Sequence, residues 1–314
     1  MNEISPNGVE AKLLQMARAV QSTGYTFTTP TPATHARVNA RPGSAWAQDL
    51  AGVFGWSRPF REDVIPPEIL ASMREAGVLL SNDAGLRSAV RLSSLDGLLF
   101  VHSAYPTTAA DSVFFGPDTY RFARAILARL KDGALVRRAV DIGCGAGPGA
   151  ILMARAHPDA EVSAVDINPS ALRMTRVSAA LAGVQVAAVD SNLLSAVPGS
   201  FDLIVSNPPY LVDPDARAYR HGGGPLGSGL SLAILDAALD RLAPGGTLLL
   251  YTGAAIVNGT DPFKMAATAQ IGGSRASWTY EELDPDVFGE ELEGGAYTAA
   301  DRIAAVVLTV KKWE

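Results

Sequence analysis

Three aspartates, Asp141, Asp166 and Asp190, each stand at the end of a short apolar run. If these runs are parallel strands, their carboxyl ends meet at one edge of a sheet, where open α/β sheets bind ligands. A carboxylate at such a place accepts both hydroxyls of a ribose, and a neighbouring one can accept the exocyclic amine of adenine. For any single aspartate the plain alternative is a helix N-cap. Together the three predict a nucleoside site.

The residues after Asp141 form a glycine loop, with Gly143, Gly145 and Gly147 at alternate positions. Glycines let the backbone turn tightly and let a ligand approach it closely. The dinucleotide fingerprint G-x-G-x-x-G requires glycine at position 148, where this chain has Pro148. An acid directly before the loop would repel a pyrophosphate and attract an ammonium group. The loop therefore predicts a cationic ligand rather than a dinucleotide.

The tetrapeptide Asn207-Pro208-Pro209-Tyr210 follows another apolar run, FDLIVS. Prolines have no N–H, so they present rigid carbonyl acceptors, and the Asn207 side-chain oxygen adds one more. Two acceptors can hold both protons of an NH2 group and draw electron density onto its nitrogen, which is a poor nucleophile in an amide or aromatic amine. Tyr210 can stack on a planar group or face a sulfonium. The motif predicts chemistry at such a nitrogen, and a plain Asn-Pro turn is the alternative.

The elements that position these residues alternate between strands and helices from residue 113 onward. Helical patterns include PDTYRFARAILARL and SLAILDAALDRLA, and apolar runs such as RRAVDIG, VSAVDI and GGTLLLYTG stand between the helical stretches. Such alternation predicts βα units and a parallel sheet covered on both faces. We expect the tail DRIAAVVLTVKKW to add an antiparallel strand at the edge of that sheet.

The preceding residues have a different pattern, and we expect an accessory or substrate domain at 1–112 and a catalytic domain at 113–314. The first domain is expected to be smaller and mixed α+β. Its predicted elements are three helices and one hairpin, at 8–20, 45–55, 66–77 and 88–103.

Composition excludes several classes of protein. The 314 residues are 48% hydrophobic and 18% charged, which is typical of a globular chain, and the net charge of −6 gives no basic footprint for nucleic acid. The one cysteine, Cys144, excludes an internal disulfide framework. The opening MNEISPNGVE lacks the apolar core of a signal peptide, and no run is apolar enough for a membrane helix. We therefore expect a cytoplasmic protein, and the scattered histidines indicate no metal site.

From residue 113 onward the chain resembles the class I S-adenosylmethionine-dependent methyltransferases, on its glycine loop and strand-end acids. The resemblance implies a Rossmann-like α/β fold, a seven-stranded sheet with helices on both faces and an antiparallel last strand, and S-adenosylmethionine as cofactor. It implies that Asp141 and the glycine loop hold the methionine end, Asp166 the ribose, and Asp190 with Asn192 the adenine side. Further cofactor contacts are expected from Phe115, Thr119, Ile167 and Asn207.

The Asn-Pro-Pro-Tyr motif is similar to that of the release-factor glutamine methyltransferases and of the adenine-amine DNA and RNA methyltransferases. Pro117-Asp118-Thr119, Arg217-Ala218-Tyr219-Arg220 and Ser228-Gly229-Leu230 add to the likeness with the glutamine group. The chain departs from that group's F-T-P-R-x-x-T-E pattern, because the arginine is missing and Tyr120 replaces the glutamate; Tyr251 replaces a second glutamate. Because of these departures, the resemblance does not extend to the protein substrate. It implies that Asn207, Pro208 and Tyr210 take part in catalysis, and that Tyr120 and Tyr210 line the substrate pocket.

Three kinds of activity stay open. The leading prediction is methyl transfer to an amine or amide nitrogen. The second is cyclisation of S-adenosylmethionine by its own amine, as in azetidine-2-carboxylate synthases, with release of methylthioadenosine. The third is a binding protein that senses S-adenosylmethionine without turnover.

For the acceptor, we expect a small molecule, because the chain has no dense cluster of Lys or Arg for a nucleic acid. A glutamine or adenine amine in a protein or nucleic acid is the alternative. We expect no membrane partner, and the sequence does not indicate an oligomeric state. Six aromatic residues are expected to roof an enclosed pocket, and the alternative is that they form the core of the first domain: Phe54, Trp56, Phe60, Phe100, Phe114 and Phe115.

Overall fold

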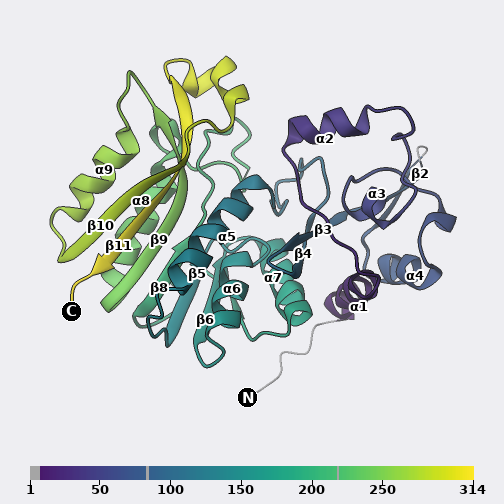
Figure 1. The fold of residues 1–314 in the computed structure, drawn as a ribbon, viewed down its shortest axis with the longest axis horizontal. Coiled ribbons are helices and arrows are strands. Elements are labelled where there is room, and N and C mark those ends of the chain that lie inside the picture. The colour runs from purple at the N-terminus through teal and green to yellow at the C-terminus, as the bar shows by residue number, and fades with distance from the viewer. Residues whose placement is uncertain (1–7, 83–84, 218) are drawn as a thin grey trace.

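A seven-stranded sheet forms the centre of the computed structural model, which describes residues 8–82, 85–217 and 219–314 (Figure 1). Its strands are β5 (Arg138–Ile142), β6 (Glu161–Asp166), β7 (Ala187–Asp190), β8 (Phe201–Ser206), β9 (Leu242–Ile256), β10 (Ala276–Asp284) and β11 (Arg302–Lys312). The spatial order is β10-β11-β9-β8-β5-β6-β7. The neighbours within β9-β8-β5-β6-β7 pair in parallel, and β11 is antiparallel to both of its neighbours. The predicted α/β class and strand number are confirmed.

The position of the last strand differs from the prediction, since β11 lies between β9 and β10 rather than at the edge. The run from Ile303 to Leu308 is buried throughout, as expected for a strand with neighbours on both sides. The edge strand β10 alternates exposed and half-buried residues, which suits a place open to water. A final apolar strand was therefore the better candidate for the interior.

Helices cover both faces of this sheet, as the βα alternation predicts (Figure 1). One buried cluster packs α5 (Pro117–Leu130), α6 (Pro148–Ala156) and α7 (Pro169–Ala182) on one face, and a second packs α8 (Gly229–Arg241) and α9 (Pro262–Ile271) on the other. Along β8, Leu203 and Val205 belong to the first cluster and Ile204 to the second. This alternation follows from the opposite directions of successive side chains in a strand.

The order of the strands reverses between β5 and β8. From β5 the chain proceeds outward through β6 and β7, and then returns to place β8 on the opposite side of β5. Such a reversal opens a crevice beyond the carboxyl ends of the two strands, because the following loops leave toward opposite faces. The glycine loop follows β5 and the Asn-Pro-Pro-Tyr motif follows β8, so both begin at this crevice.

The residues before the sheet are mixed α+β. Their elements are α1 (Gly8–Ser22), α2 (Pro32–Asn39), α3 (Leu50–Phe54), η1 (Glu62–Val64), α4 (Pro67–Glu75), β1 (Leu79–Asn82), β2 (Gly85–Ser88), β3 (Val90–Leu95) and β4 (Leu98–Ser103). The helices expected at 8–20 and 66–77 and the hairpin are confirmed, and Asp96 and Gly97 both take positive φ in its turn. Helix α3 is shorter than predicted, and α2 was not predicted. Later in the chain there are three short helices, η2 (Pro225–Gly227), η3 (Gly289–Glu293) and η4 (Gly295–Tyr297).

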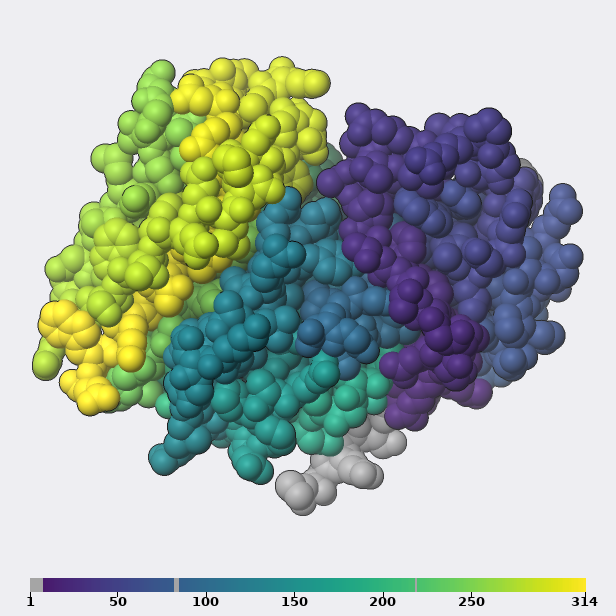
Figure 2. Space-filling view, viewed as in Figure 1, coloured from purple at the N-terminus to yellow at the C-terminus, as the bar shows by residue number. Residues whose placement is uncertain are grey.

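The early elements pack directly against the sheet's helices. The carboxylate of Glu10 in α1 pairs with Arg176 in α7 at 2.6 Å, and the Ser178 hydroxyl in α7 accepts the backbone N–H of Val101 in β4 at 3.1 Å. On the face seen in Figure 2, a notch separates the purple early residues from the yellow late ones. One buried cluster includes residues from both sides of position 112. The division into domains at 112 stays a prediction.

Two findings concern larger classes of function. Within the described ranges, every helix is too short or too polar to cross a membrane. In that same part of the chain, no three His, Cys, Asp or Glu side chains gather as metal ligands do. Residues 1–7, on which the expectation about a signal peptide depends, lie outside the described residues.

Replacing Ser178 with Ala should lower the free energy of unfolding by about 1–3 kcal/mol, because the buried N–H of Val101 loses its acceptor. Urea denaturation measures the change. The control is Ser22→Ala, whose hydroxyl is exposed and should change the free energy by less than about 0.5 kcal/mol. Equal losses in the two variants would contradict a docking role for Ser178.

Candidate functional site

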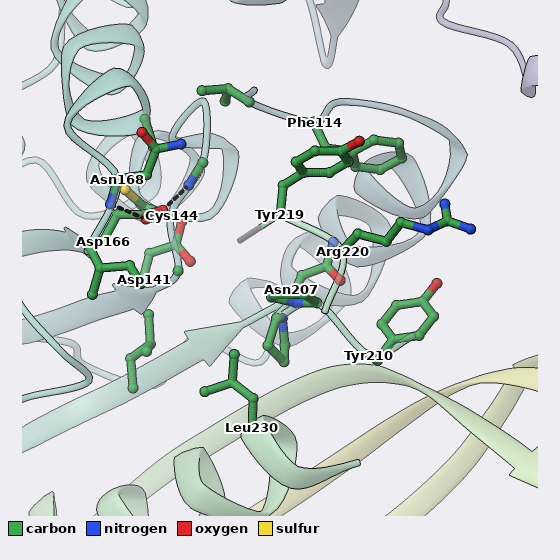
Figure 3. A pocket seen from close by; sticks show the side chains of 18 of the residues that line it. Phe114, Asp141, Cys144, Asp166, Asn168, Asn207, Tyr210, Tyr219, Arg220 and Leu230 are labelled. Atoms are coloured by element: carbon green, nitrogen blue, oxygen red, sulfur yellow. Dashed lines mark hydrogen bonds between the residues drawn. The ribbon is translucent and has the colours of Figure 1, made fainter. Parts of the chain in front are cut away.

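A pocket of about 200 Å³ lies at the carboxyl ends of β5, β6, β7 and β8 (Figure 3). Figure 3 shows two groups of side chains around it. We call the first the glycine-loop end, formed by Asp141, Gly143, Gly145, Asp166, Ile167 and Asn192. We call the second the motif end, formed by Phe114, Asp118, Asn207, Pro208, Tyr210 and Tyr219. The predicted ligand-binding acids and the predicted nitrogen-binding motif thus share one cavity.

Asp141 is the most deeply buried carboxylate at the glycine-loop end, with 1% of its surface exposed. Its Oδ2 accepts the backbone N–H of Ala150 at 3.0 Å, while Oδ1 has no hydrogen-bond partner among the described residues. Burial raises the pKa of the Asp141 carboxyl to about 7. A buried carboxylate oxygen without a partner on a pocket wall fits a cationic group of a ligand, such as an ammonium.

Gly149 explains how the backbone comes so close to Asp141. A Cβ at this position would lie 2.6 Å from Asp141 Oδ2, which is closer than atoms pack. Glycine here lets the first turn of α6 approach the carboxylate, and Ala150 then donates its N–H. At the other end of the loop Gly147 has φ +83° and precedes α6, outside the pocket lining. Gly147 thus shapes the loop, and the cofactor contact expected of it stays a prediction.

Asp166 fixes the glycine loop from the neighbouring strand. Its Oδ2 accepts the N–H of Gly145 at 3.0 Å, and its Oδ1 accepts the N–H of Asn168 at 2.9 Å. Burial raises the pKa of the Asp166 carboxyl, although these backbone bonds oppose the shift. Each oxygen keeps a second lone pair for a ligand hydroxyl. Beside it, Ile167 is 60% exposed at the pocket wall, where it offers an apolar surface to a flat ring.

Of the two residues predicted to lie on the adenine side, Asp190 and Asn192 at the end of β7, only one lines the pocket. Asn192 lines the pocket together with Ser191 and Leu193. Asp190 is exposed at the end of β7 and lies outside the lining. The strand therefore delivers its next residues, rather than its last one, to the cavity. The adenine contact expected of Asp190 stays a prediction.

The Asn-Pro-Pro-Tyr motif begins directly after β8 and lines the motif end. The Ser206 hydroxyl donates to the carbonyl of Ile142 at 2.7 Å, so the last residues of β8 and β5 are tied together. Asn207 is half-buried and Tyr210 is 6% exposed. The Tyr210 hydroxyl donates to Asp118 Oδ2 at 2.6 Å. The Asn207 side chain and the Tyr210 ring thus face the cavity, and the backbone before them is fixed to β5, the strand that leads into the glycine loop.

Two predicted aromatic contacts lie outside the pocket lining. Phe115 is 3% exposed and stacks on His102, with ring centroids 4.9 Å apart. The Tyr120 hydroxyl accepts the N–H of Thr29 at 3.0 Å, so this ring packs toward the early elements. Phe114 lines the cavity instead, with 36% of its surface exposed. Adjacent residues of an extended segment point to opposite sides, which explains why the neighbour of the predicted residue faces the ligand space.

The expected aromatic roof is wrong for most of its members. Of the six residues, Phe114 alone lines the pocket. Phe54, Phe60 and Phe100 have no exposed surface and form the core of the early elements. Aromatic side chains bury large apolar areas, and that core uses them.

Several lining residues were missed by the sequence reasoning as parts of the site. Tyr219 donates its hydroxyl to the carbonyl of Thr107 at 2.5 Å, and Arg220 pairs with Glu291. Phe288, far along the chain, also lines the pocket. Asp118, Tyr219 and Arg220 carried a signal, since they stand in the Pro-Asp-Thr and Arg-Ala-Tyr-Arg segments that resemble the glutamine enzymes. For Phe288 the local sequence carries none.

Part of the chain is similar to known proteins. Residues 109–256 match the family model of the methyltransferase small domain. The release factor glutamine methyltransferase of Deinococcus radiodurans is 36% identical over 167 residues, which are 49% of this chain and 55% of that protein. The tRNA1(Val) (adenine(37)-N6)-methyltransferase of Aeromonas hydrophila is 36% identical over 132 residues, 39% of this chain and 54% of that protein. The chain spans less than two thirds of the length of either relative.

The fold also has solved counterparts. A protein from Pyrococcus horikoshii superposes with a TM-score of 0.50 at 13% identity, over 81% of this chain and 84% of that one. At this identity the likeness shows the fold alone.

The comparisons correct one expectation from the sequence. A small-molecule acceptor was expected and nucleic acid was not. The relatives matched by the chain are named for a release factor and for a tRNA, so this expectation is overturned. Net charge misled because it averages over the whole chain, whereas partner recognition depends on local surfaces.

The affinity for S-adenosylmethionine should rise with pH up to about 7, by at most about tenfold per pH unit. A bound ammonium favours the ionised Asp141, so below this pH binding must release a proton from the carboxyl. Above about pH 8 the ligand's own α-amine loses its charge, and affinity falls again. Titration calorimetry across this range measures both limbs. Asp141→Asn should remove the acid limb, and the same acid limb in both proteins would contradict the assignment.

Asp166→Ala should weaken S-adenosylmethionine binding by roughly 10- to 150-fold, because hydrogen bonds to a charged acceptor contribute about 1.5–3 kcal/mol. Asp166→Asn keeps the shape and one acceptor oxygen, so its affinity should lie between those of Asp166→Ala and the unsubstituted chain. The comparison variant is Asp190→Ala at the neighbouring strand end. Calorimetry with unchanged affinity for Asp166→Ala would disprove the ribose contact.

Proposed function

We propose, from the match of residues 109–256 to the family model of the methyltransferase small domain, that this chain is an N-methyltransferase using S-adenosylmethionine. The observation that carries the proposal is the place of the Asn-Pro-Pro-Tyr motif. It shares one cavity with the glycine loop and the buried Asp141, on a strand paired directly with β5. Acceptors for an NH2 group and a site for a cationic nucleoside thus face the same space.

The glycine-loop end supports S-adenosylmethionine as the cofactor. Asp141 offers an unpaired carboxylate oxygen for its ammonium group, and Asp166 keeps lone pairs for ribose hydroxyls. Ile167 and Asn192 line the remaining wall, where the adenine would lie. When bound, S-adenosylmethionine supplies a methyl group on a positively charged sulfonium. The buried Cys144 fits a reducing compartment, and we include a cytoplasmic location in the proposal.

The motif end would hold the acceptor nitrogen. The Asn207 oxygen and a proline carbonyl accept the two N–H groups, which fixes the plane of the NH2 group and leaves the lone pair, perpendicular to that plane, open to attack on the methyl group. The Tyr210 ring lies at the wall where a planar amide or base can stack. Over the whole reaction the nitrogen gains a methyl group and releases one proton. Holding the reactants in line supplies much of the rate, because it replaces an encounter by a fixed geometry.

We propose the side-chain amide of a protein glutamine as the acceptor. The release factor glutamine methyltransferase supports this choice, with the longer of the two reported matches. The exocyclic amine of adenine in RNA is the second candidate, supported by the tRNA methyltransferase of equal identity. Both acceptors present a planar NH2 group, which is the group that the motif fits.

The test offers tritiated-methyl S-adenosylmethionine to the purified chain with a bacterial release factor and, separately, with bacterial tRNA. Enzymatic digestion and chromatography of the labelled product should give methylglutamine from the protein or methyladenosine from the RNA, with adenosylhomocysteine as the second product. Methylthioadenosine as the second product would instead show cyclisation of the cofactor, and would contradict the proposal.

Asn207→Ala should reduce kcat by about 100-fold or more while changing the affinity for S-adenosylmethionine little, as for a lost transition-state contact. The matched control is Asn192→Ala at the glycine-loop end, which should weaken cofactor binding and leave kcat at saturation nearly unchanged. Steady-state kinetics and calorimetry separate the two effects. If Asn207→Ala keeps kcat within a few-fold, the nitrogen-holding role is wrong.

A further inference from the structure

Asp118, a carboxylate at the motif end, accepts hydrogen bonds from two tyrosine hydroxyls and has no role in the proposed reaction so far. Asp118, in the first turn of α5, is 4% exposed and lines the pocket. Its Oδ2 accepts the hydroxyl of Tyr210 at 2.6 Å, and its Oδ1 accepts the hydroxyl of Tyr251 at 2.7 Å. Two tyrosines from different segments therefore share one buried acid, and one of them belongs to the Asn-Pro-Pro-Tyr motif.

The Tyr210 ring has little freedom apart from this bond. A Cβ on Gly253 of β9 would lie 2.2 Å from the ring, so the ring rests directly on the strand's backbone. Phe288 meets it edge-on, with centroids 5.8 Å apart. The hydroxyl bond to Asp118 fixes the remaining end of the side chain. Backbone, edge contact and carboxylate together set the plane of the ring.

The surroundings of Asp118 decide how it responds to pH. Its charged and titratable neighbours are Tyr210, Tyr251 on β9 and Arg121 on α5, whose guanidinium lies 3.1 Å from Oδ1. Arg121 also pairs with Asp284 of β10 at 2.6 Å, so it is shared between two acids. Burial raises the pKa of the Asp118 carboxyl above its ordinary value, although the three donors oppose the shift.

Tyr251 stands where the glutamine enzymes usually have a glutamate, and the structure gives this departure a physical meaning. A glutamate at 251 would place a second carboxylate near Asp118, and two like charges in a buried site repel each other. A tyrosine hydroxyl donates to Asp118 instead. In this chain Asp118 is consequently the shared acceptor of the Tyr210 and Tyr251 hydroxyls.

We propose that Asp118 is a positioning residue for the acceptor, because its carboxylate holds the Tyr210 ring in the plane on which the acceptor stacks. The inference rests on the proposed function and deepens it. Ionised Asp118 accepts both hydroxyls. Protonated Asp118 becomes a donor at one oxygen, so it no longer accepts both hydroxyls as a charged group, and its hold on the Tyr210 ring weakens. Acceptor binding should therefore weaken as pH falls through the pKa of Asp118, independently of Asp141.

The first experiment uses no activity. The chain has eight tyrosines, and labelling their Cζ atoms with carbon-13 gives signals that report on each hydroxyl's hydrogen bond. Tyr210→Phe and Tyr251→Phe assign two of them. In the ligand-free protein both signals should shift with one common midpoint as pH falls, and neither should shift in Asp118→Asn. Signals that do not titrate in the unsubstituted protein, or that titrate equally in Asp118→Asn, would overturn the inference.

The second experiment is a double-mutant cycle on the acceptor that the labelling assay identifies. Asp118→Asn and Tyr210→Phe should each raise the acceptor's KM about tenfold at neutral pH, and the double variant should show the same rise rather than their product. Affinity for S-adenosylmethionine should stay unchanged in all three. Multiplying effects, or an equal loss of cofactor affinity, would mean that Asp118 merely supports the fold.

Arg121→Gln is the matched control, since it removes the same carboxylate's ion pair and leaves both tyrosine bonds. It should keep the acceptor's KM at high pH and move the acid limb to higher pH, because a positive charge that favours the ionised carboxyl is lost. An acid limb that does not move would contradict the assignment to Asp118. Absence of methyl transfer by the unsubstituted chain would disprove the proposed function, whereas the carbon-13 titration would still test Asp118.

Discussion

The pairing of β5 with β8 is the constraint on which the rest of the site depends. Ile142 lies opposite Ser206 in this parallel pair, and the Ser206 hydroxyl donates to the Ile142 carbonyl. The next residues are the glycine loop on one side and Asn207 on the other. Because the two strands end together, a loop suited to a cationic nucleoside and a motif suited to an NH2 group open onto one cavity. The other lining residues are arranged around the ends of these two strands.

The two ends of the cavity use buried acids in opposite ways. Among the described residues Asp141 keeps one oxygen without a partner, so a bound cation would offset part of the cost of burying this carboxylate. Asp118 has both oxygens taken by protein donors, so it acts on the geometry of its neighbours. One carboxylate is thus prepared for a ligand, while the other is occupied in holding a ring. Their different hydrogen bonding, rather than their depth, distinguishes these roles.

The sequence could predict those parts of the site that consist of residues adjacent in the chain. The acids at strand ends, the glycine loop and the Asn-Pro-Pro-Tyr motif each carry a local pattern, and the structure brings most of these residues to one pocket. It could not predict the contacts of Asp118, whose partners lie 92 and 133 residues away. The sequence also could not show which of Phe114 and Phe115 lines the pocket, because either neighbour satisfies the same pattern and packing against His102 decides between them. The place of β11 depended on recognising β10, whose exposed residues give a weak signal.

The insertion of β11 between β9 and β10 also bears on the order in which the site is completed during synthesis. Tyr251 and Gly253, which support the Tyr210 ring, pair across the sheet with Val307 and Ala305 of β11. A growing chain therefore carries Asp141, Asp166 and Asn207 well before the strand that backs the ring's support exists. Until then β9 presents an unpaired edge, which is a surface prone to wrong pairing. The wall against which the acceptor would stack is the last part of the pocket to be assembled.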